Sequence, residues 1–408
     1  MRLLTKILTA GTALAALATA AHAGGFNRGG ANLEGLYGSG VIALYSGATF
    51  VSPGRSYTEA TGKVVINGVP TPFKQTGIAF GDDYYIPYAS VGGRMVGDLS
   101  CVGSYSQPFG ADTTYEGEMT YHKSQEYLST DEYGLTCGYG FDVGPGRLSV
   151  IGGGFYETIE YAQARSFEKA FGTVGDSKVE LESGAFGYRL GLGYEMPEIG
   201  LKAQLMYRSA TNHDGEGAYT NTPFRTLAIA GGMPANIANA IYGNAMTAPA
   251  SATQELPQSL EFSMQTGIAP GWLAFGLVKW TDWSVLQQLV VTEQIGGRAF
   301  GPPNFFFEDN WVVTGGIVRR FTDQLAVSGL ITWDKGVTTG WDTLTDTWTF
   351  GSGVVYDVSE KFQVRAGGAA IYFLPGEKTN TASAVADYTA YSPAEWGYAL
   401  QAALTLRF

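Results

Sequence analysis

Residues that carry enzyme chemistry are scarce in this sequence. The 408 residues include 3 histidines and 2 cysteines. His22 falls in an N-terminal leader, and we expect His122 and His213 to lie in outer loops, each without a second metal ligand at the usual spacing. A Ser-His-acid hydrolase would need one of these histidines beside a serine. We therefore expect no metal site, no cofactor and no catalytic residue, and the sequence favours a protein that is not an enzyme.

Long hydrophobic runs are also missing, with one short exception at the N-terminus. Arg2 and Lys6 precede an apolar stretch over residues 7–20, and residues 21–23 have the small-x-small pattern of a cleavage site. This pattern predicts a secretory signal peptide over residues 1–23. The run is shorter than the roughly 20 apolar residues that a membrane-spanning helix requires, and no later stretch reaches that length uninterrupted.

Positive charge is in short supply as well. The chain has 25 Lys and Arg against 37 Asp and Glu, for a formal net charge of −12. Loss of Arg2 and Lys6 with the leader would make the balance still more acidic. Because binding to phosphate backbones needs clustered Lys and Arg, the composition argues against nucleic acid as a partner.

Glycine, tyrosine and phenylalanine are abundant instead, with 57, 24 and 22 residues, and they occur in alternating segments along the chain. The C-terminus shows this most clearly, because one parity reads Tyr398, Leu400, Ala402, Leu404, Leu406 and Phe408. The other parity reads Ala399, Gln401, Ala403, Thr405 and Arg407. Such alternation predicts a strand with one apolar face. Repeated along the chain, it is typical of a barrel whose strands face lipid on one side and a polar lumen on the other.

Short turns and long polar segments alternate along the sequence. Short turns are expected near Gly92-Gly93, Gly144-Pro145-Gly146, Met196-Pro197-Glu198, Ala269-Pro270-Gly271, Thr322-Asp323 and Ser359-Glu360. Long loops are expected near 54–80, 107–125, 162–182, 211–256, 294–308, 335–343 and 374–394. This order predicts an all-β fold, a 14-stranded antiparallel transmembrane β-barrel over residues 44–408. Its short turns and both chain ends would lie on the periplasmic side of a Gram-negative outer membrane.

Several motifs identify a possible family. They are Leu256-Pro257-Gln258, Leu260-Glu261-Phe262-Ser263, Ala269-Pro270-Gly271-Trp272, Trp280-Thr281-Asp282-Trp283-Ser284 and Gln287-Gln288-Leu289. Together they resemble the central strands of the long-chain fatty acid transporter (FadL/TodX) family. The resemblance implies passive uptake of hydrophobic small molecules through a fourteen-stranded barrel. Phe408 also resembles the C-terminal signal that the barrel-assembly machinery reads.

The sequence departs from that family at two places. Residues 24–43 leave room for only a short hatch-like plug segment before the first strand, without the family's Asn-Pro-Ala motif. The Arg and Lys that bind a fatty-acid carboxylate in the best-known members have no aligned counterpart. Tyr161 and the prolines 302–303 fall near those positions, and Arg165 and Arg298 are close in sequence. We take these two arginines as candidate ligand-binding residues.

Two apolar segments in the expected outer loops are further candidates for ligand binding. Residues 233–248 carry no charge, and Pro234, Ile237 and Ile241 follow the pattern of a helix. Phe305, Phe306 and Phe307 form a second apolar group, and three consecutive aromatics cannot all point to one face of a strand. These segments could capture hydrophobic cargo, or the loops could merely pack on each other.

The two cysteines fall in neighbouring expected strands at matched height. Cys101 and Cys137 each share the parity of apolar residues, so they could lie directly opposite one another. The oxidising periplasm would permit a disulfide between them. The alternative is a pair of small apolar side chains that face lipid.

These observations favour an outer-membrane channel for passive uptake of hydrophobic small molecules, such as long-chain fatty acids. Its expected partners are that cargo, the surrounding lipid and lipopolysaccharide, and the barrel-assembly machinery. The alternatives are a general porin for polar solutes and a structural barrel without transport. A porin should show charged residues around a constriction, and the inward positions Gln265, Gln401 and Thr405 suggest few charges in the lumen.

Overall fold

The computed structural model describes residues 26–37, 41–66, 69–121, 123–166, 176–221, 229, 232–242, 246–293, 304–340, 342–380 and 386–408. The expected leader, His122 and Arg298 lie outside these residues.

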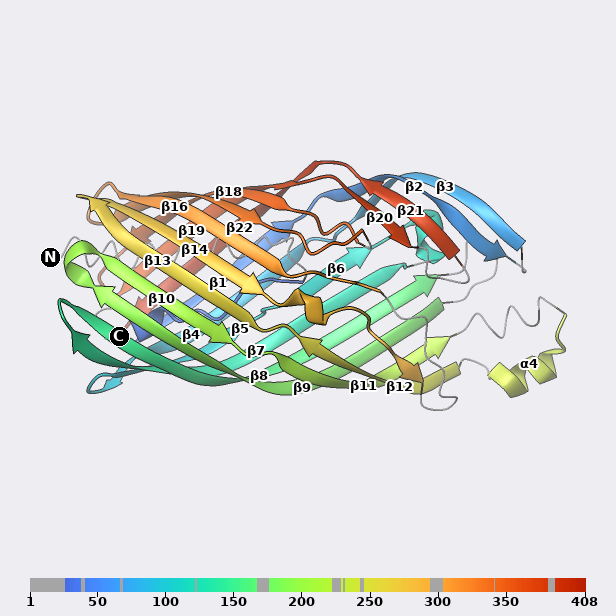
Figure 1. The fold of residues 1–408 in the computed structure, drawn as a ribbon, viewed down its shortest axis with the longest axis horizontal. Coiled ribbons are helices and arrows are strands. Elements are labelled where there is room, and N and C mark those ends of the chain that lie inside the picture. Colours follow the sequence, from blue (N-terminus) through green and yellow to red (C-terminus); the bar gives the residue numbers. More distant parts are fainter. Residues whose placement is uncertain are drawn as a thin grey trace.

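The chain forms a closed 14-strand antiparallel barrel, which confirms the predicted fold class (Figure 1). In order around the barrel, its wall consists of β1 (Ala43–Ser52), β4 (Tyr84–Val96), β5 (Leu99–Ser106) with β6 (Gly110–Thr114), β7 (Gln125–Val143), β8 (Gly146–Ser166), β9 (Asp176–Met196), β10 (Leu201–Arg208) with β11 (Thr211–Asn221), β12 (Met246–Leu256) with β13 (Ser259–Ala269), β14 (Trp272–Thr281) with β15 (Thr292–Glu293), β16 (Asn310–Arg320), β17 (Leu325–Asp334), β18 (Thr347–Asp357), β19 (Phe362–Phe373) and β22 (Glu395–Arg407). The barrel closes because β1 pairs with β22 on one side and with β4 on the other.

Helical segments are short. In the described part of the chain they are the 3-10 turns η1 (Glu34–Leu36), η2 (Gly117–Tyr121), η3 (Pro197–Ile199) and η4 (Trp283–Val285), and the helix α4 (Ala235–Tyr242). Within the described residues, no helix has the length and apolar character needed to cross a membrane. Helix α4 lies beyond the loop end of β11 and β12 (Figure 1).

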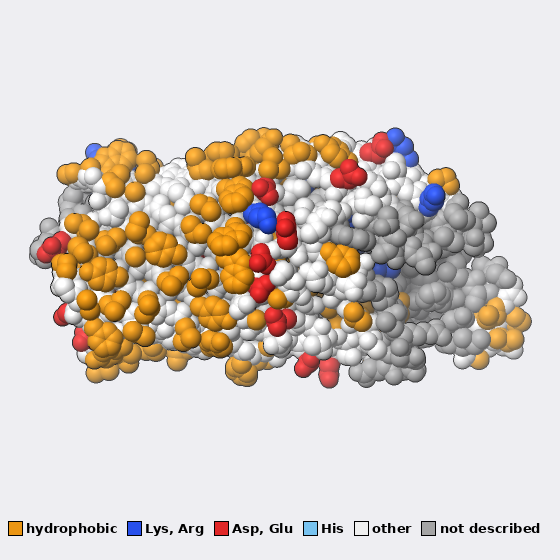
Figure 2. Space-filling view, viewed as in Figure 1, with side chains coloured by type: hydrophobic (Ala, Val, Ile, Leu, Met, Phe, Trp, Pro, Cys, Tyr) orange, Lys and Arg blue, Asp and Glu red, His pale blue; other side chains and the backbone are white. Residues whose placement is uncertain are grey.

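The strands alternate between a lipid-facing and a lumenal side. On β7, Tyr133 and Leu135 are exposed on the outside, whereas Glu132 and Thr136 are buried on the inside. Figure 2 shows the outward apolar side chains as a broad band over the barrel, which ends along a row of acidic side chains on the loop side. This period of two is the pattern on which the sequence prediction rested.

A second, four-stranded sheet extends beyond the loop end of the barrel (Figure 1). It contains β2 (Arg55–Ile66), β3 (Val69–Phe80), β20 (Gly376–Asn380) and β21 (Ala386–Ser392). The sequence predicted polar loops over 54–80 and 374–394, which is wrong for the described part of both segments. Apolar side chains such as Tyr57, Ile78 and Tyr388 give this outer sheet a small core of its own.

Asp342 supports the outer sheet through an ion pair with Lys378 of β20, at 3.4 Å. Burial alone would raise the pKa of Asp342, but Lys378, Lys123 and the Thr343 N–H outweigh it and lower that pKa below its usual range. A lowered pKa in the folded state means that ionised Asp342 stabilises the sheet at neutral pH. That stabilisation is lost as the pH falls below the usual aspartate range, through the lowered pKa.

We expect Asp342→Asn to speed hydrogen exchange of the β20 amides severalfold at pH 7, because Lys378 then lacks its buried counter-ion. The matched control is Glu377→Gln, an exposed site on the same strand. After correction for intrinsic exchange rates, wild type should approach the variant as the pH falls below the usual aspartate range and through the lowered pKa of Asp342. Equal protection in wild type and Asp342→Asn at pH 7 would show that the pair does not stabilise the sheet.

One predicted turn is misplaced. Gly92 and Gly93 lie within β4, and the chain turns at Gly97, whose φ is 55°. A Cβ added at Gly92 would stand 2.3 Å from the Cys101 carbonyl oxygen, and one at Gly93 would stand 2.7 Å from that of Val41. These glycines are therefore required for close backbone approach within the wall and not for a change of direction.

Cys101 and Cys137 are bonded to each other across β5 and β7. Their Cα atoms are register partners, 4.0 Å apart, and the pair lies on the outward parity between exposed Leu135 and Tyr139. The geometry thus combines both alternatives drawn from the sequence, because the half-cystines face lipid and also form a bridge.

We expect the double variant Cys101→Ser/Cys137→Ser to assemble, since the β5–β7 ladder persists, but to lose roughly 2–4 kcal/mol of stability. Heating in SDS should convert the compact gel band of the variant to the unfolded band at a lower temperature. Alkylation of unreduced wild-type protein by a maleimide after unfolding would show instead that the thiols are free.

Candidate ligand-binding site in the barrel lumen

Among the described residues, the largest apolar core lies inside the barrel, towards the loop end. We call it the upper cluster; its buried members are Phe26, Phe109, Leu128, Tyr161, Val179, Leu181, Tyr219, Ala250, Ala252, Leu256, Trp283, Leu286, Leu289, Val291, Phe305, Phe307 and Val337. Trp283 is fully buried at its centre. The Trp283 ring meets those of Phe109 and Phe26 edge to face, with centroids 5.4 and 5.7 Å apart. Such edge contacts are a favourable arrangement for aromatic pairs.

The family-like motifs explain how Trp283 is positioned. Directly before it, the Asp282 N–H donates to the Gln258 carbonyl oxygen at 3.0 Å, and the Gln258 side-chain amide donates to Asp282 Oδ2 at 2.9 Å. The indole N–H of Trp280 donates to Asp309 Oδ2, also at 2.9 Å. The first two bonds connect the β12–β13 break at 257–258 with the end of β14, and the third connects β14 with the residue before β16, so that the chain turns inward at Trp283.

Phe305 and Phe307 enter the same cluster from the segment before β16. The Phe305 and Phe306 N–H groups both donate to the Gln287 carbonyl oxygen, at 2.9 and 3.0 Å. Phe306 has a φ of 48°, a left-handed conformation that is rare for an aromatic residue. The backbone therefore turns at Phe306, and the flanking Phe305 and Phe307 side chains are both buried.

An apolar pocket adjoins the upper cluster. Its wall is formed by Phe26, Leu128, Ile159, Tyr161, Leu181, Glu182, His213, Gly215, Ala252, Gln254, Leu256, Leu286, Leu289 and Phe305. The described part of this wall contains no Lys or Arg. A concave, mostly apolar wall with a few polar groups is the usual form of a site for small hydrophobic ligands.

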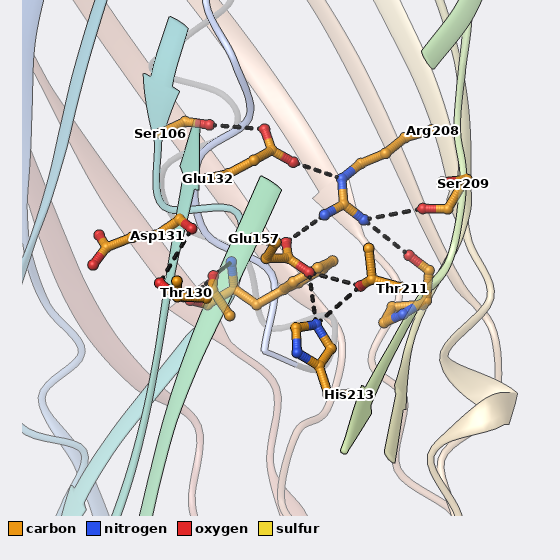
Figure 3. A network of polar contacts seen from close by, with 12 residues as sticks. Ser106, Thr130, Asp131, Glu132, Glu157, Arg208, Ser209, Thr211 and His213 are labelled. Atoms are coloured by element: carbon orange, nitrogen blue, oxygen red, sulfur yellow. Dashed lines mark hydrogen bonds and ion pairs between the residues drawn. The ribbon is translucent and has the colours of Figure 1, made fainter. Parts of the chain in front are cut away.

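A network of charged side chains, which we call the charged layer, meets the pocket at His213, which contacts Glu157 (Figure 3). Arg208 of β10 donates to Glu132 at 3.0 Å and also contacts Glu157. Arg189 of β9 contacts the other oxygen of Glu132. Four consecutive strands, β7 to β10, thus contribute two carboxylates and two guanidinium groups, all largely buried and paired with one another.

Glu157 is also bound on its pocket side. The Thr211 hydroxyl donates to Glu157 Oε1 at 2.7 Å, and His213 Nε2 lies 3.3 Å from the same oxygen. Both residues are on β11, which continues the wall after the break at 209–210 (Figure 3). The charged layer therefore ends at His213, where the apolar pocket begins.

A polar cavity occupies the lumen beyond the charged layer, towards the periplasmic turns. Its walls include Lys202, Gln204, Glu261, Lys279 and Gln401. The sequence suggested few inward charges, and this is wrong. The reason is that neighbouring strands supply opposite charges to one level of the lumen, as at Glu261 and Lys279, which are register partners on β13 and β14.

The described N-terminal residues 26–37 run inside the barrel, from the upper cluster to the polar cavity. Near the upper cluster they pair with the β5–β6 break, where the Arg28 N–H donates to the Pro108 carbonyl oxygen and the Gly110 N–H to that of Phe26, both at 2.7 Å. Further down, Glu34 accepts two hydrogen bonds from Arg365 of β19, each 3.0 Å long. Both ends of the segment are thereby attached to the wall.

The structure brings together only some of the candidate ligand-binding residues. Phe305 and Phe307 lie in the upper cluster, whereas Ile237 is 45% exposed on α4. The Ile241 side chain and Arg298 lie outside what the structure describes. Arg165 is half-buried on β8, four residues nearer the loop end than Tyr161.

The expected loop position of His213 is wrong, because it lies on β11 and is 2% exposed. Sequence reasoning also missed Glu132, Glu157, Arg189 and Arg208. The sequence did contain a signal for these four residues, since each one is a charged residue at an inward position of a strand whose alternate positions are exposed. Their mutual pairing could not be read from the sequence, because it depends on contacts between residues 51–76 positions apart.

The fold and the lumenal pocket define an outer-membrane β-barrel of the transport class. The family model described as outer membrane protein transport protein (OMPP1/FadL/TodX) matches residues 118–372. The chain belongs to this family. A search of curated proteins found no match.

Solved structures show the same fold. A FadL homologue of Pseudomonas aeruginosa superposes with a TM-score of 0.74 at 13% identity, with 90% of each chain covered. The Pseudomonas putida toluene transporter TodX gives 0.58 at 12% identity, with 96% of each chain covered. The Ralstonia pickettii toluene transporter TbuX gives 0.55 at 12% identity, with 92% of this chain and 91% of that chain covered.

Proposed function

We propose that this protein admits small hydrophobic molecules across the outer membrane by passive diffusion, without a catalytic step. The observation that carries the proposal is the apolar pocket inside the barrel, between the loop end and the charged layer. Lipopolysaccharide sugars block apolar solutes, so a protein must offer them an apolar surface. Two of the similar solved structures are described as toluene transporters, which supports a cargo of this class.

The candidate residues take different roles in this proposal. Phe305 lines the pocket and Phe307 packs behind it, so both contribute to binding. Exposed Ile237 on α4 would act earlier, in capture at the cell surface, together with Ile241. Arg165 and Arg298 would lie at the outer mouth, where the ends of long side chains can meet a polar group of the cargo.

The remaining segments complete the proposed arrangement. Residues 1–23 act as the export signal, and residues 24–43 act as a short hatch in the lumen. Support for the hatch comes from the bonds of Phe26, Arg28 and Glu34 to the wall. Phe408, whose N–H donates to the Ile42 carbonyl oxygen at 3.0 Å, completes the closing strand for the assembly machinery.

The outer surface fits lipid and lipopolysaccharide as partners. Exposed Glu160, Glu182 and Glu216 are successive register partners on β8, β9 and β11, on the loop side of the apolar band. A change from apolar to acidic side chains at one level is expected where hydrocarbon gives way to head groups.

A polar-solute channel is the second candidate. The charges of the lower cavity, such as Lys202 and Glu261, are of the kind that line selective constrictions. The position of the N-terminal segment across that cavity argues against a freely open water path.

Uptake in cells separates the two functions. The protein should be expressed in a Gram-negative strain that lacks its own transporter for apolar compounds, with an intact lipopolysaccharide layer. We expect uptake of labelled toluene at limiting concentration to rise severalfold, while sugar uptake and bilayer conductance stay unchanged. A rise in sugar uptake and conductance without a rise for the apolar solutes would favour the porin.

A further inference from the structure

His213 is a polar residue at the end of an otherwise apolar pocket. Its neighbours in the wall include Leu181, Leu256 and Phe305, and its ring is almost completely buried. The other polar wall groups are already engaged or turned outward. The Tyr161 hydroxyl donates to Glu126 at 3.3 Å, and the Gln254 amide donates to the Glu255 carbonyl oxygen at 3.0 Å. Glu182 is on the exposed, outward parity of β9.

The contacts of Nε2 fix the orientation and tautomer of the His213 ring. Nε2 lies 3.3 Å from Glu157 Oε1 and 3.2 Å from Thr211 Oγ1. The carboxylate carries no hydrogen, and the Thr211 hydroxyl already donates its hydrogen to Glu157. The hydrogen between these atoms must therefore be on Nε2, so that in the neutral form of the ring Nδ1 is a hydrogen-bond acceptor.

Nδ1 is buried and has no hydrogen-bond partner among the described residues. A buried acceptor without a partner costs free energy that a donor group can recover. Arg208 and Thr211 restrain Glu157, and Glu157 in turn restrains the ring. The acceptor thus belongs to a wall residue of the pocket whose ring is held in a fixed orientation.

We infer that His213 is a specificity-determining residue, which selects hydrophobic ligands that carry one neutral hydroxyl group, as in a phenol or an alcohol. The hydroxyl donates to Nδ1, and the hydrocarbon part occupies the apolar wall. A carboxylate is disfavoured, because it has no hydrogen to donate, Glu157 is close, and Arg208 is already paired with two glutamates. The inference rests on the proposed function, since it names the class of cargo for that pocket.

Matched probes and two substitutions test this role with purified protein in detergent. The probes are 4-ethylphenol, 4-ethyltoluene, which replaces the hydroxyl by a methyl group, and 4-ethylbenzoate. His213→Asn keeps a polar atom at the position of Nδ1, whereas His213→Gln keeps one at the position of Nε2 and loses the one at Nδ1. Folding of both variants is checked by the heat-dependent gel shift, and affinities are measured by titration calorimetry.

We expect wild type to bind the phenol roughly 3- to 10-fold more tightly than 4-ethyltoluene, as one net hydrogen bond allows. The ratio of the affinity for 4-ethylphenol to that for 4-ethyltoluene should persist in His213→Asn and fall to about one in His213→Gln. The third probe, 4-ethylbenzoate, should bind most weakly. Tightest binding of the benzoate, or equal loss of the ratio in both variants, would overturn the inference. If wild type binds phenol and hydrocarbon equally, the inference fails while the proposed function stands. If no probe binds, both fail.

Discussion

Replacing Phe305 and Phe307 together by serine is expected to weaken binding of an apolar ligand at least tenfold. Phe305 lines the pocket, and Phe307 packs on the same aromatic group, with ring centroids 5.4 Å apart. A fully buried side chain of this kind contributes roughly 1.5–3 kcal/mol, and about 1.4 kcal/mol corresponds to a tenfold change in affinity. The expected tenfold loss of affinity requires only part of that free energy to come from contact with the ligand. Calorimetric titration with 4-ethyltoluene measures it directly.

The control for this variant is Ile237→Ser on α4. Because Ile237 is exposed, its loss should leave the affinity within twofold of wild type and affect only uptake by cells. Both proteins must first show the wild-type gel shift on heating. If the double serine variant folds and binds as tightly as wild type, the upper cluster is packing alone and the ligand lies elsewhere.

The second large effect is expected in the charged layer. Arg208→Met should lower barrel stability by roughly 3–5 kcal/mol, because it leaves buried Glu157 without its guanidinium partner. The temperature at which the compact gel band disappears in SDS reports this change. The matched control is Arg147→Met, whose partner Asp98 is half exposed, and there we expect a change of about 0–1 kcal/mol.

A double variant separates the loss of charge pairing from the loss of packing. Arg208→Met with Glu157→Gln removes the unpaired carboxylate and should recover much of the stability. The methionine still covers Phe155, over whose ring the guanidinium lies at 4.5 Å. A double variant as unstable as Arg208→Met alone would assign the effect to packing.

The alternation of apolar and polar residues, together with the glycine and proline residues at turns, allowed much of the barrel to be predicted. The closing strand β22 follows the predicted parity, with Leu400 exposed and Gln401 buried. The turn at 144–145 follows from a Gly-Pro-Gly sequence, whose glycine has a φ of 60°. Such signals are local, so they can be read without knowledge of the partner strand.

The errors come from residues whose role depends on distant neighbours. Gly92 and Gly93 have the composition of a turn, but the Cys101 and Val41 backbones approach them too closely for a side chain. His213 lies in a segment that is polar by composition, but Glu157, 56 residues away, places it in the lumen. The outer sheet was missed for the same reason, because β2 and β21 are paired across most of the chain.

The candidate site was predicted only in its apolar part. Three consecutive phenylalanines indicated that the aromatic side chains must divide between two directions, and Phe306 makes that division through its left-handed backbone. The charged layer could not be predicted, since its residues become neighbours only when the barrel closes. In the proposed function, the charged layer limits the hydrophobic cargo to the region between the loops and His213.

The most direct measurement is the position of a heavy-atom ligand in crystals of the protein. Crystals soaked with 4-bromotoluene should show an anomalous bromine peak in the pocket bounded by Leu256, Leu286 and Phe305. The signal should disappear in the Phe305→Ser/Phe307→Ser variant. Bromine found only in the lower cavity, beside Lys202 and Glu261, or nowhere in the lumen of wild type, would contradict a hydrophobic path through this barrel.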